Sequence, residues 1–160
     1  LIENTSILTS NISIKKKNYT GKINSVILES MLTDAKDLFK ENYNQYKLMH
    51  MIIDKYIIDG VSYSSLQDQI SNDEICLEIK LISIPNLLIL EIENILKKYQ
   101  IQVNNFLDKG YVKDFFLDKQ LDISQMAHKL KNGMNKKEVQ ITSKYTKKIG
   151  FFEKFFQLFS

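Results

Sequence analysis

Residues 73–84 alternate between apolar and polar side chains, which is the pattern of a β-strand with one buried face. Glu78 and Lys80 stand at polar positions of this run. Because successive side chains of a strand point to opposite faces, such a run needs a neighbouring layer to cover its apolar side. The segment therefore predicts a sheet at the centre of the fold, with a buried row made of Ile75, Leu77, Ile79 and Leu81.

Two further segments predict strands beside this one. Residues 6–16 are rich in Ile, Thr and Ser, and residues 46–58 form an apolar run with a short polar interruption. Asp59 and Gly60 predict a turn directly after the second of these strands. The polar, Ser- and Gln-rich residues 61–72 then predict a loop.

Apolar residues recur at helical spacing in two places. Residues 25–39 show this period first, and either Asn24 or Ser25 is the expected N-cap. Pro85 predicts the start of a second helix, because the N–H that proline lacks is not needed in the first turn. The buried side of this second helix should hold Leu88, Ile92, Ile95, Leu96 and Tyr99.

A short strand at 101–103 completes the predicted order β-α-β-β-α-β. This order is typical of a small α+β domain, in which an antiparallel sheet carries two helices on one face. The chain has 160 residues and 44% of them are apolar, which is enough for the core of one such domain. We assign residues 1–112 to it. The single cysteine, Cys76, excludes a disulfide within the chain.

The residues after this domain are more basic and less periodic. Apolar residues on both sides of Gly110 predict a helix that this glycine interrupts, and residues 124–131 predict a short helix that ends at Gly133. The polar, lysine-rich residues 132–148 predict a flexible linker. We therefore treat residues 113–146 as a helical annex and basic linker.

Residues 147–160 predict an amphipathic helix. Five of the nine phenylalanines of the chain lie here, and on a helical wheel they gather on the side opposite Glu153, Lys154 and Gln157. An apolar arc of this width, preceded by lysines, is typical of a helix that lies on a membrane surface. The predicted membrane-binding residues are Lys147, Lys148, Ile149, Phe151, Phe152, Phe155, Phe156, Leu158 and Phe159.

The energetics of this segment predict reversible membrane contact. Each large apolar side chain gains about 1.5–3 kcal/mol on leaving water, and each lysine adds about 1 kcal/mol over anionic lipid. These gains are opposed by the cost of forming a short helix. Two alternatives stay open for the same apolar side: the groove of a partner protein covers it, or the core of this chain does. No run of about 18 apolar residues exists, so the sequence predicts no membrane-spanning helix.

Residues that carry catalysis in other proteins are few here. His50 lies inside an apolar strand, where we expect a hydrogen-bonded sheet residue and not a general base. His128 has no partners spaced as metal ligands, and Cys76 has no histidine companion. We expect no enzymatic activity, cofactor or metal. We also expect no nucleic-acid binding, because the chain has no arginine and its tail gathers the aromatic rings on one side.

One stretch of the sequence is similar to a known family motif. Residues 50–60 read HMIIDKYIIDG and resemble the strand "HVIPxxYxIDG" of FtsA, the bacterial actin-like cell-division protein family. Residues 31–36 are similar to the family's "VLxxAK" helix, and residues 77–82 to its "LEVxxHII" strand. Residues 86–103 resemble its "helix then LxVD" ending. The positions that match the first motif are His50, Ile52, Tyr56, Ile58, Asp59 and Gly60.

The resemblance covers about two-thirds of the chain, residues 11–112, and corresponds to the family's 1C subdomain, which has an SHS2-type fold. It implies contacts with cell-division proteins and self-association. The family also ends in a linker and an amphipathic membrane-targeting helix, which implies a peripheral position on the inner face of the bacterial cytoplasmic membrane. The chain departs from the pattern at Ile53, where the family has proline, and at 61–72, which lack the "IxxPxGxxG" turn.

The family's nucleotide-binding lobes are not represented, because roughly 45 residues between 104 and the tail are too few to form them. The resemblance therefore implies a non-catalytic division adaptor bound to anionic lipid. Two alternatives stay open. The chain, which begins with Leu and not Met, is a fragment of an actin-like ATPase, or it is an interaction module whose tail helix binds a partner groove.

Overall fold

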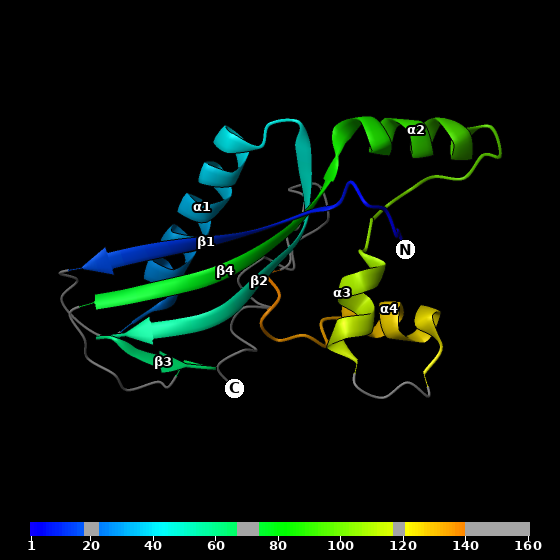
Figure 1. Ribbon diagram of the computed structural model, residues 1–160. Coiled ribbons are helices and arrows are strands. Elements are labelled where there is room, and N and C mark those ends of the chain that lie inside the picture. The colour runs from blue at the N-terminus through cyan, green and yellow to red at the C-terminus, as the bar shows by residue number, and fades with distance from the viewer. Residues whose placement is uncertain (18–22, 67–73, 117–120, 140–160) are drawn as a thin grey trace.

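Four antiparallel strands form the sheet in the computed structural model, which describes residues 1–17, 23–66, 74–116 and 121–139. The strands lie in the spatial order β1-β4-β2-β3 (Figure 1). Helices cover the sheet and extend from it, so the predicted α+β class is confirmed. The strands are β1 (Leu8–Lys17), β2 (Tyr46–Ile58), β3 (Val61–Tyr63) and β4 (Glu74–Pro85).

The alternating segment forms β4, which pairs with β1 on one side and with β2 on the other. All four residues of its predicted apolar row are buried. Towards the end of the strand the alternation stops, and Ile82, Ser83 and Ile84 are buried in succession. A strand that is buried on both faces has apolar residues in succession, without alternation. This part of β4 is covered on both faces.

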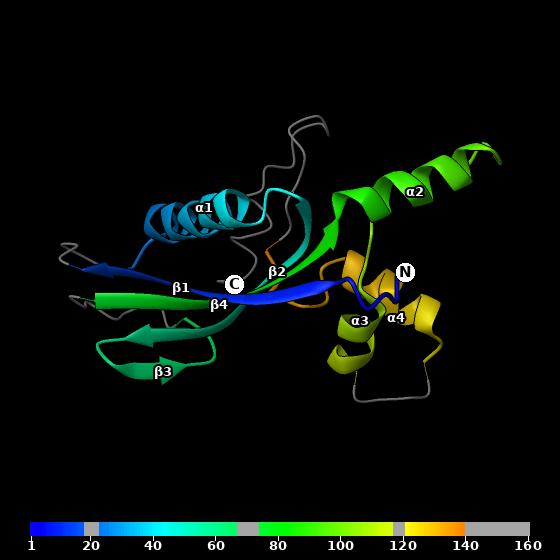
Figure 2. The ribbon, with the colours of Figure 1, turned by 45° about the horizontal axis from the view of Figure 1, so that its top comes forward.

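Helix α1 (Ser25–Asn42) covers one face of the sheet, as its period predicted (Figure 2). It begins at the expected N-cap, where the Asn24 side chain accepts a hydrogen bond from the Ile27 amide at 3.0 Å. Phe39 is its largest fully buried residue and stacks on Tyr43. The buried helix residues, Leu28, Met31, Leu32, Ala35 and Phe39, form one core with Met51, Ile53 and the β4 row.

Helices α3 (Lys109–Phe115) and α4 (Ile123–Lys131) cover the other face. Val112 and Leu130 pack there against Ile52 and Ile82, which point away from α1. Gly110 lies in the first turn of α3, so the predicted interruption of this helix is wrong. The short helix that was predicted at 124–131 is confirmed, and Gly133 follows it with a φ of 82°.

Helix α2 (Asn86–Lys97) does not share the face of α1, which corrects the predicted arrangement of two helices on one face. It extends beyond the end of the sheet (Figures 1 and 2). Of its residues only Ile89 is buried, whereas Ile95 is 56% exposed and Tyr99, just beyond the helix, is 72% exposed. The cause is local: α2 begins at Asn86, directly after β4 ends, so no connecting loop turns it back over the sheet.

Two predictions around the turns are also wrong. Residues 61–63 form β3 and not a loop, because Asp59 and Gly60 have positive φ angles of 46° and 81° and bring Val61 opposite Ile58. Paired positive φ angles are typical of the tightest β-hairpin turns. Residues 101–103, which were predicted as a strand, belong to no strand. The Ile101 amide instead donates to the Leu96 carbonyl at the end of α2.

The prediction of a flexible linker from residue 132 is wrong for residues 135–139, because these residues are bound to β2. The Ile53 amide donates to the Lys137 carbonyl at 2.9 Å, and the Val139 amide donates to the Met51 carbonyl at 2.7 Å. Val139 is 6% exposed and belongs to the core under α1. The rest of the predicted linker and the amphipathic helix at 147–160 lie outside the described residues. Within the described ranges, no helix has the length and hydropathy to cross a membrane.

Candidate functional site

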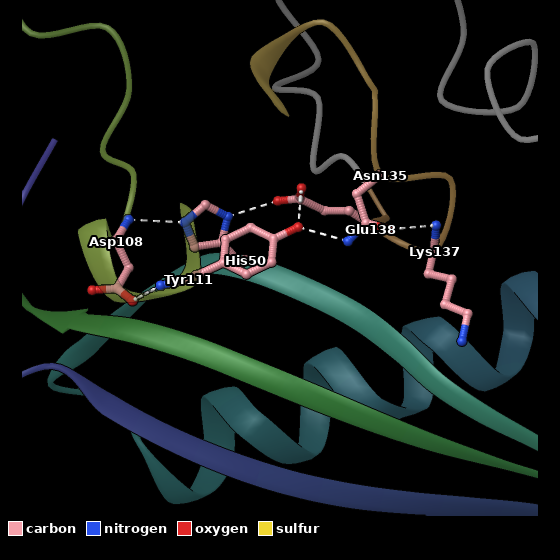
Figure 3. Close-up of polar contacts among 6 residues, drawn as sticks. All are labelled: His50, Asp108, Tyr111, Asn135, Lys137 and Glu138. Atoms are coloured by element: carbon pink, nitrogen blue, oxygen red, sulfur yellow. Dashed lines mark hydrogen bonds and ion pairs between the residues drawn. The ribbon is translucent and has the colours of Figure 1, made fainter. Parts of the chain in front are cut away.

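The most concentrated group of polar side chains lies between β2 and α3, around His50. This residue is 3% exposed and points toward α3, away from the α1 face. A register shift in β2 between Leu48 and His50 sets its position. Its ring lies against that of Tyr111, with 4.6 Å between the ring centroids (Figure 3). A buried imidazole in this position needs partners for both nitrogens, since an unpaired polar atom in a core costs free energy.

Both ring nitrogens of His50 have such partners. The backbone amide of Asp108 donates to Nε2 at 3.0 Å, so Nε2 carries a lone pair. The ring proton therefore sits on Nδ1, which donates to Oε1 of Glu138 at 2.6 Å (Figure 3). His50 is thus held as one neutral tautomer between α3 and the segment that follows α4.

The second carboxylate oxygen of Glu138 extends the network. Tyr111 donates its hydroxyl proton to Oε2 at 2.8 Å. The side-chain amide of Asn135 donates to the same hydroxyl oxygen at 2.7 Å, and its carbonyl oxygen accepts from the Lys137 amide at 3.0 Å. Residues 135–138 are therefore tied to α3 by side chains as well as to β2 by backbone bonds.

Electrostatics keep the Tyr111 hydroxyl protonated. Burial raises the pKa of Tyr111, and the nearby carboxylate of Glu138 raises it further, while the bond from Asn135 acts in the opposite direction. The hydroxyl consequently remains a donor to Glu138 over the whole ordinary pH range. Asp108 adds to the order of the site, since its carboxylate caps α3 by accepting from the Tyr111 amide at 2.7 Å.

A carboxylate beside an imidazole is also the arrangement of many general bases, and the geometry decides between the two roles. A histidine base needs a free ring nitrogen within reach of a substrate proton. Here Nε2 accepts from a backbone amide and Nδ1 donates to Glu138, and the ring is buried. The prediction that His50 is a hydrogen-bonded sheet residue is confirmed. The network therefore has a structural role, and we call it the staple: it joins β2, the start of α3 and residues 135–138.

Sequence reasoning did not find the partners of His50. Glu138 is 88 positions away, and nothing local marks it as a partner. One signal was present: residues 119–160 contain nine lysines and only three acidic residues, one of which is Glu138. A solitary carboxylate in a lysine-rich segment is a candidate for a specific contact.

The other two candidate residues have ordinary surroundings. Cys76 is half-buried in β4, where burial and the Glu78 carboxylate raise the pKa of its thiol, so the reactive thiolate is disfavoured. His128 is exposed on α4 and contacts Asn132. Among the described residues, no three His, Cys, Asp or Glu side chains lie together as metal ligands would.

Helix α2 and the chain that follows it form a second surface feature among the described residues. A shallow groove of about 440 Å³ runs beside the helix and is lined by Glu93, Lys97 and residues 100–103. One wall residue is acidic and one is basic, so the groove has no dominant charge. The exposed apolar side chains in and around this helix are Leu87, Leu90, Ile95, Tyr99 and Ile101.

The predicted membrane-binding residues all lie outside the described part of the chain: Lys147, Lys148, Ile149, Phe151, Phe152, Phe155, Phe156, Leu158 and Phe159. No protein-family model matches the chain, and no curated protein matches it. Three of the stretches that resemble FtsA motifs lie in β2 and its turn, in α1 and in β4. In the fourth, residues 86–97 form α2, but residues 101–103 form no strand. The relationship to the family stays a prediction.

Proposed function

We propose that this chain is a non-catalytic adaptor, which is held at a membrane surface by residues 147–160 and presents its α+β body to other proteins. The observation that carries the proposal is the arrangement of the tail sequence, with five phenylalanines on one side of the predicted helix behind two lysines. Following the FtsA resemblance, the surface is the inner face of the bacterial cytoplasmic membrane and the partners are cell-division proteins.

The charge distribution supports a membrane contact that is confined to the tail. Residues 1–139 contain 18 lysines and 18 acidic residues, so their formal charges cancel. Residues 140–160 contain four lysines and one glutamate, which account for the whole net charge of +3. Attraction to anionic lipid is therefore a property of the tail, while the body has no net attraction that competes with it.

The His50 network supports the proposal because it fixes the residues just before the tail to the folded part of the chain. A membrane-bound tail can hold the folded body at the membrane only if the residues from which the tail continues are fixed to a folded element. The last described residue, Val139, is bonded to Met51 in the middle of β2, and the preceding Glu138 is bonded to His50 and Tyr111. The staple thus holds the point from which the tail continues.

Helix α2 supports the part of the proposal that concerns protein contacts. It extends from the sheet and leaves apolar side chains such as Ile95 in solvent, next to the exposed Tyr99. Exposed apolar patches with a polar surround mark interaction surfaces more often than chance. Because α2 adds little to the core, the proposal assigns its exposed apolar residues to contacts with other proteins.

Co-sedimentation with vesicles tests the membrane contact. We expect the full chain to sediment with vesicles that contain anionic lipid and to bind zwitterionic vesicles more weakly. The double variant Phe152→Asp, Phe155→Asp should lose binding by about a hundredfold or more, since each ring contributes about 1.5–3 kcal/mol. The matched control Gln157→Asp, Ser160→Asp adds the same charge outside the apolar arc and should keep most of the binding.

Equal sedimentation of the wild-type chain and the phenylalanine double variant would contradict the proposal. A wild-type chain that binds neither kind of vesicle would favour the alternative in which the tail helix fills a groove of a partner protein. Tight binding of ATP, measured by calorimetry, would contradict the non-catalytic reading.

A further inference from the structure

The described residues leave most of the apolar side chains of helix α2 wholly or partly uncovered. Seven of its twelve residues are leucine or isoleucine, and only Ile89 is buried. A helix with apolar residues on most of its sides is normally enclosed by other elements. Five apolar residues in and just after the helix recur at helical spacing and are half-buried or exposed. We call them the α2 stripe: Leu88, Ile92, Ile95, Leu96 and Tyr99.

The last described residues run along β2 in a defined direction. The Ile53 amide donates to the Lys137 carbonyl, and the Val139 amide donates to the Met51 carbonyl. Residues 137–139 are therefore antiparallel to β2, as the isolated bridge in this segment also shows. At Val139 the chain is directed toward the start of β2.

The start of β2 and the start of α2 lie at the same end of the sheet (Figure 1). Tyr46, the first residue of β2, stands opposite Pro85, the last residue of β4. The amide of Asn86, the first residue of α2, donates to the Gln45 carbonyl at 2.9 Å. The direction of the chain at Val139 therefore leads toward α2.

The chain after Val139 is long enough to lie along α2. From Met51 back to Tyr46 a strand advances five residues, which is about 17 Å. The seven residues 140–146 span up to about 23 Å when extended. The helix predicted at 147–160 has a length of about 21 Å, and α2, with its twelve residues, of about 18 Å. The two helices therefore match in length.

We propose that the amphipathic helix predicted at 147–160 docks on the α2 stripe of its own chain when no membrane is present, and that membrane binding withdraws it. The apolar side of each helix then covers the apolar side of the other. A tethered segment has an effective concentration of about a millimolar, so it occupies the stripe ahead of a free partner. The docking concerns this chain alone, whereas the withdrawal rests on the proposed membrane function.

Anionic lipid offers the tail an attraction that α2 does not. Lys147 and Lys148 are drawn to a negatively charged surface. Residues 86–98 contain two glutamates and two lysines, so α2 has no net charge to hold these lysines. Withdrawal of the tail uncovers the α2 stripe. The adaptor therefore offers this surface to other proteins only when its tail is on the membrane.

Hydrogen exchange of the α2 amides in the full chain tests the docking without any membrane. In the wild-type chain these amides should exchange about tenfold more slowly than in Phe152→Asp, Phe155→Asp, which corresponds to a stripe that is occupied nine-tenths of the time. The matched control Gln157→Asp, Ser160→Asp should exchange like the wild type. Vesicles that contain anionic lipid should raise the wild-type rate to that of the phenylalanine variant.

Vesicle affinity supplies a second measurement, with substitutions in α2 itself. Ile95→Asp disrupts the stripe and frees the tail, so the full chain should bind anionic vesicles about tenfold more tightly. Asn94→Asp adds the same charge beside the stripe and should leave the affinity close to that of the wild type. Circular dichroism confirms that both variants are folded.

Equal exchange of the α2 amides in the wild type and the phenylalanine variant would overturn the docking. Slow exchange that depends on protein concentration would overturn it too, because a second copy would then be the cover. Weaker vesicle binding by Ile95→Asp than by Asn94→Asp would show that α2 contacts the membrane, against the proposal. A chain whose tail slows exchange in α2 but that binds no vesicle would support the docking and contradict the proposed membrane function, so the two fail separately.

Discussion

The two faces of the sheet are closed in different ways. On one face a single long helix, α1, covers a core that is made of apolar side chains contributed by neighbouring elements. On the other face two short helices cover a smaller apolar cluster, and the polar network of His50, Tyr111 and Glu138 joins β2 and α3 to residues 135–138. The first face is built by burial, which has no direction, and the second by hydrogen bonds, which do. We therefore expect the first to supply more stability and the second to fix where the tail begins.

The largest effect is expected from the α1 face. Phe39→Ala removes a side chain that is 2% exposed, and it should lower the free energy of unfolding by about 3–5 kcal/mol because it leaves a cavity in the core. Leu38→Ala, at a neighbouring position that is 41% exposed, is the control and should cost much less. Denaturant unfolding measures both. Equal costs for the two variants would show that α1 is not packed as described.

A buried tyrosine on the same face should make the fold sensitive to alkali. Burial raises the pKa of Tyr56 from 10 to about 12. Because the folded-state pKa is the higher one, its contribution is complete below pH 10 and is lost as the pH rises toward 12. The loss due to Tyr56 is about 2–3 kcal/mol, and the alkaline loss of stability should be smaller by this amount in Tyr56→Phe, where Tyr111 still contributes. Unfolding measured across this range for both proteins, with Tyr99→Phe as an exposed control, checks the sign. An identical pH profile for wild type and Tyr56→Phe would contradict it.

The smallest effect on stability is expected from the network face. Glu138→Gln keeps the size of the side chain but places an amide donor against either the His50 Nδ1–H or the Tyr111 hydroxyl. The variant should lose about 1–3 kcal/mol, which is the cost of a buried donor without an acceptor. Glu93→Gln on α2 makes the same change on the surface and should cost almost nothing. If the network also fastens the tail root, hydrogen exchange at the Val139 amide should be faster in Glu138→Gln than in Glu93→Gln.

Local rules in the sequence were sufficient for most elements. Alternation predicted β4, the helical period and Asn24 predicted α1, and Gly133 predicted the end of α4, because each of these signals depends on residues a few positions apart. Residues 61–63 were missed because a three-residue strand has too little pattern of its own. It exists because the Asp59–Gly60 turn returns the chain to the open edge of β2.

The position of α2 shows where local rules end. Its apolar residues were recognised, yet amphipathicity does not say which surface, if any, covers the apolar side. The decisive fact is the direct connection between β4 and α2, which carries the helix past the end of the sheet. The same limit applies to Glu138, since its bond to His50 joins positions that are 88 residues apart.

The sequence by itself therefore determined most of the described helices and strands and the α+β class, because period and capping are properties of neighbouring residues. Only the tertiary structure decided which face each helix covers, that α2 stands in solvent, and that His50 is a buried staple for the segment before the tail. These depend on contacts between distant positions, and their free energy is gained only once the chain has closed those loops.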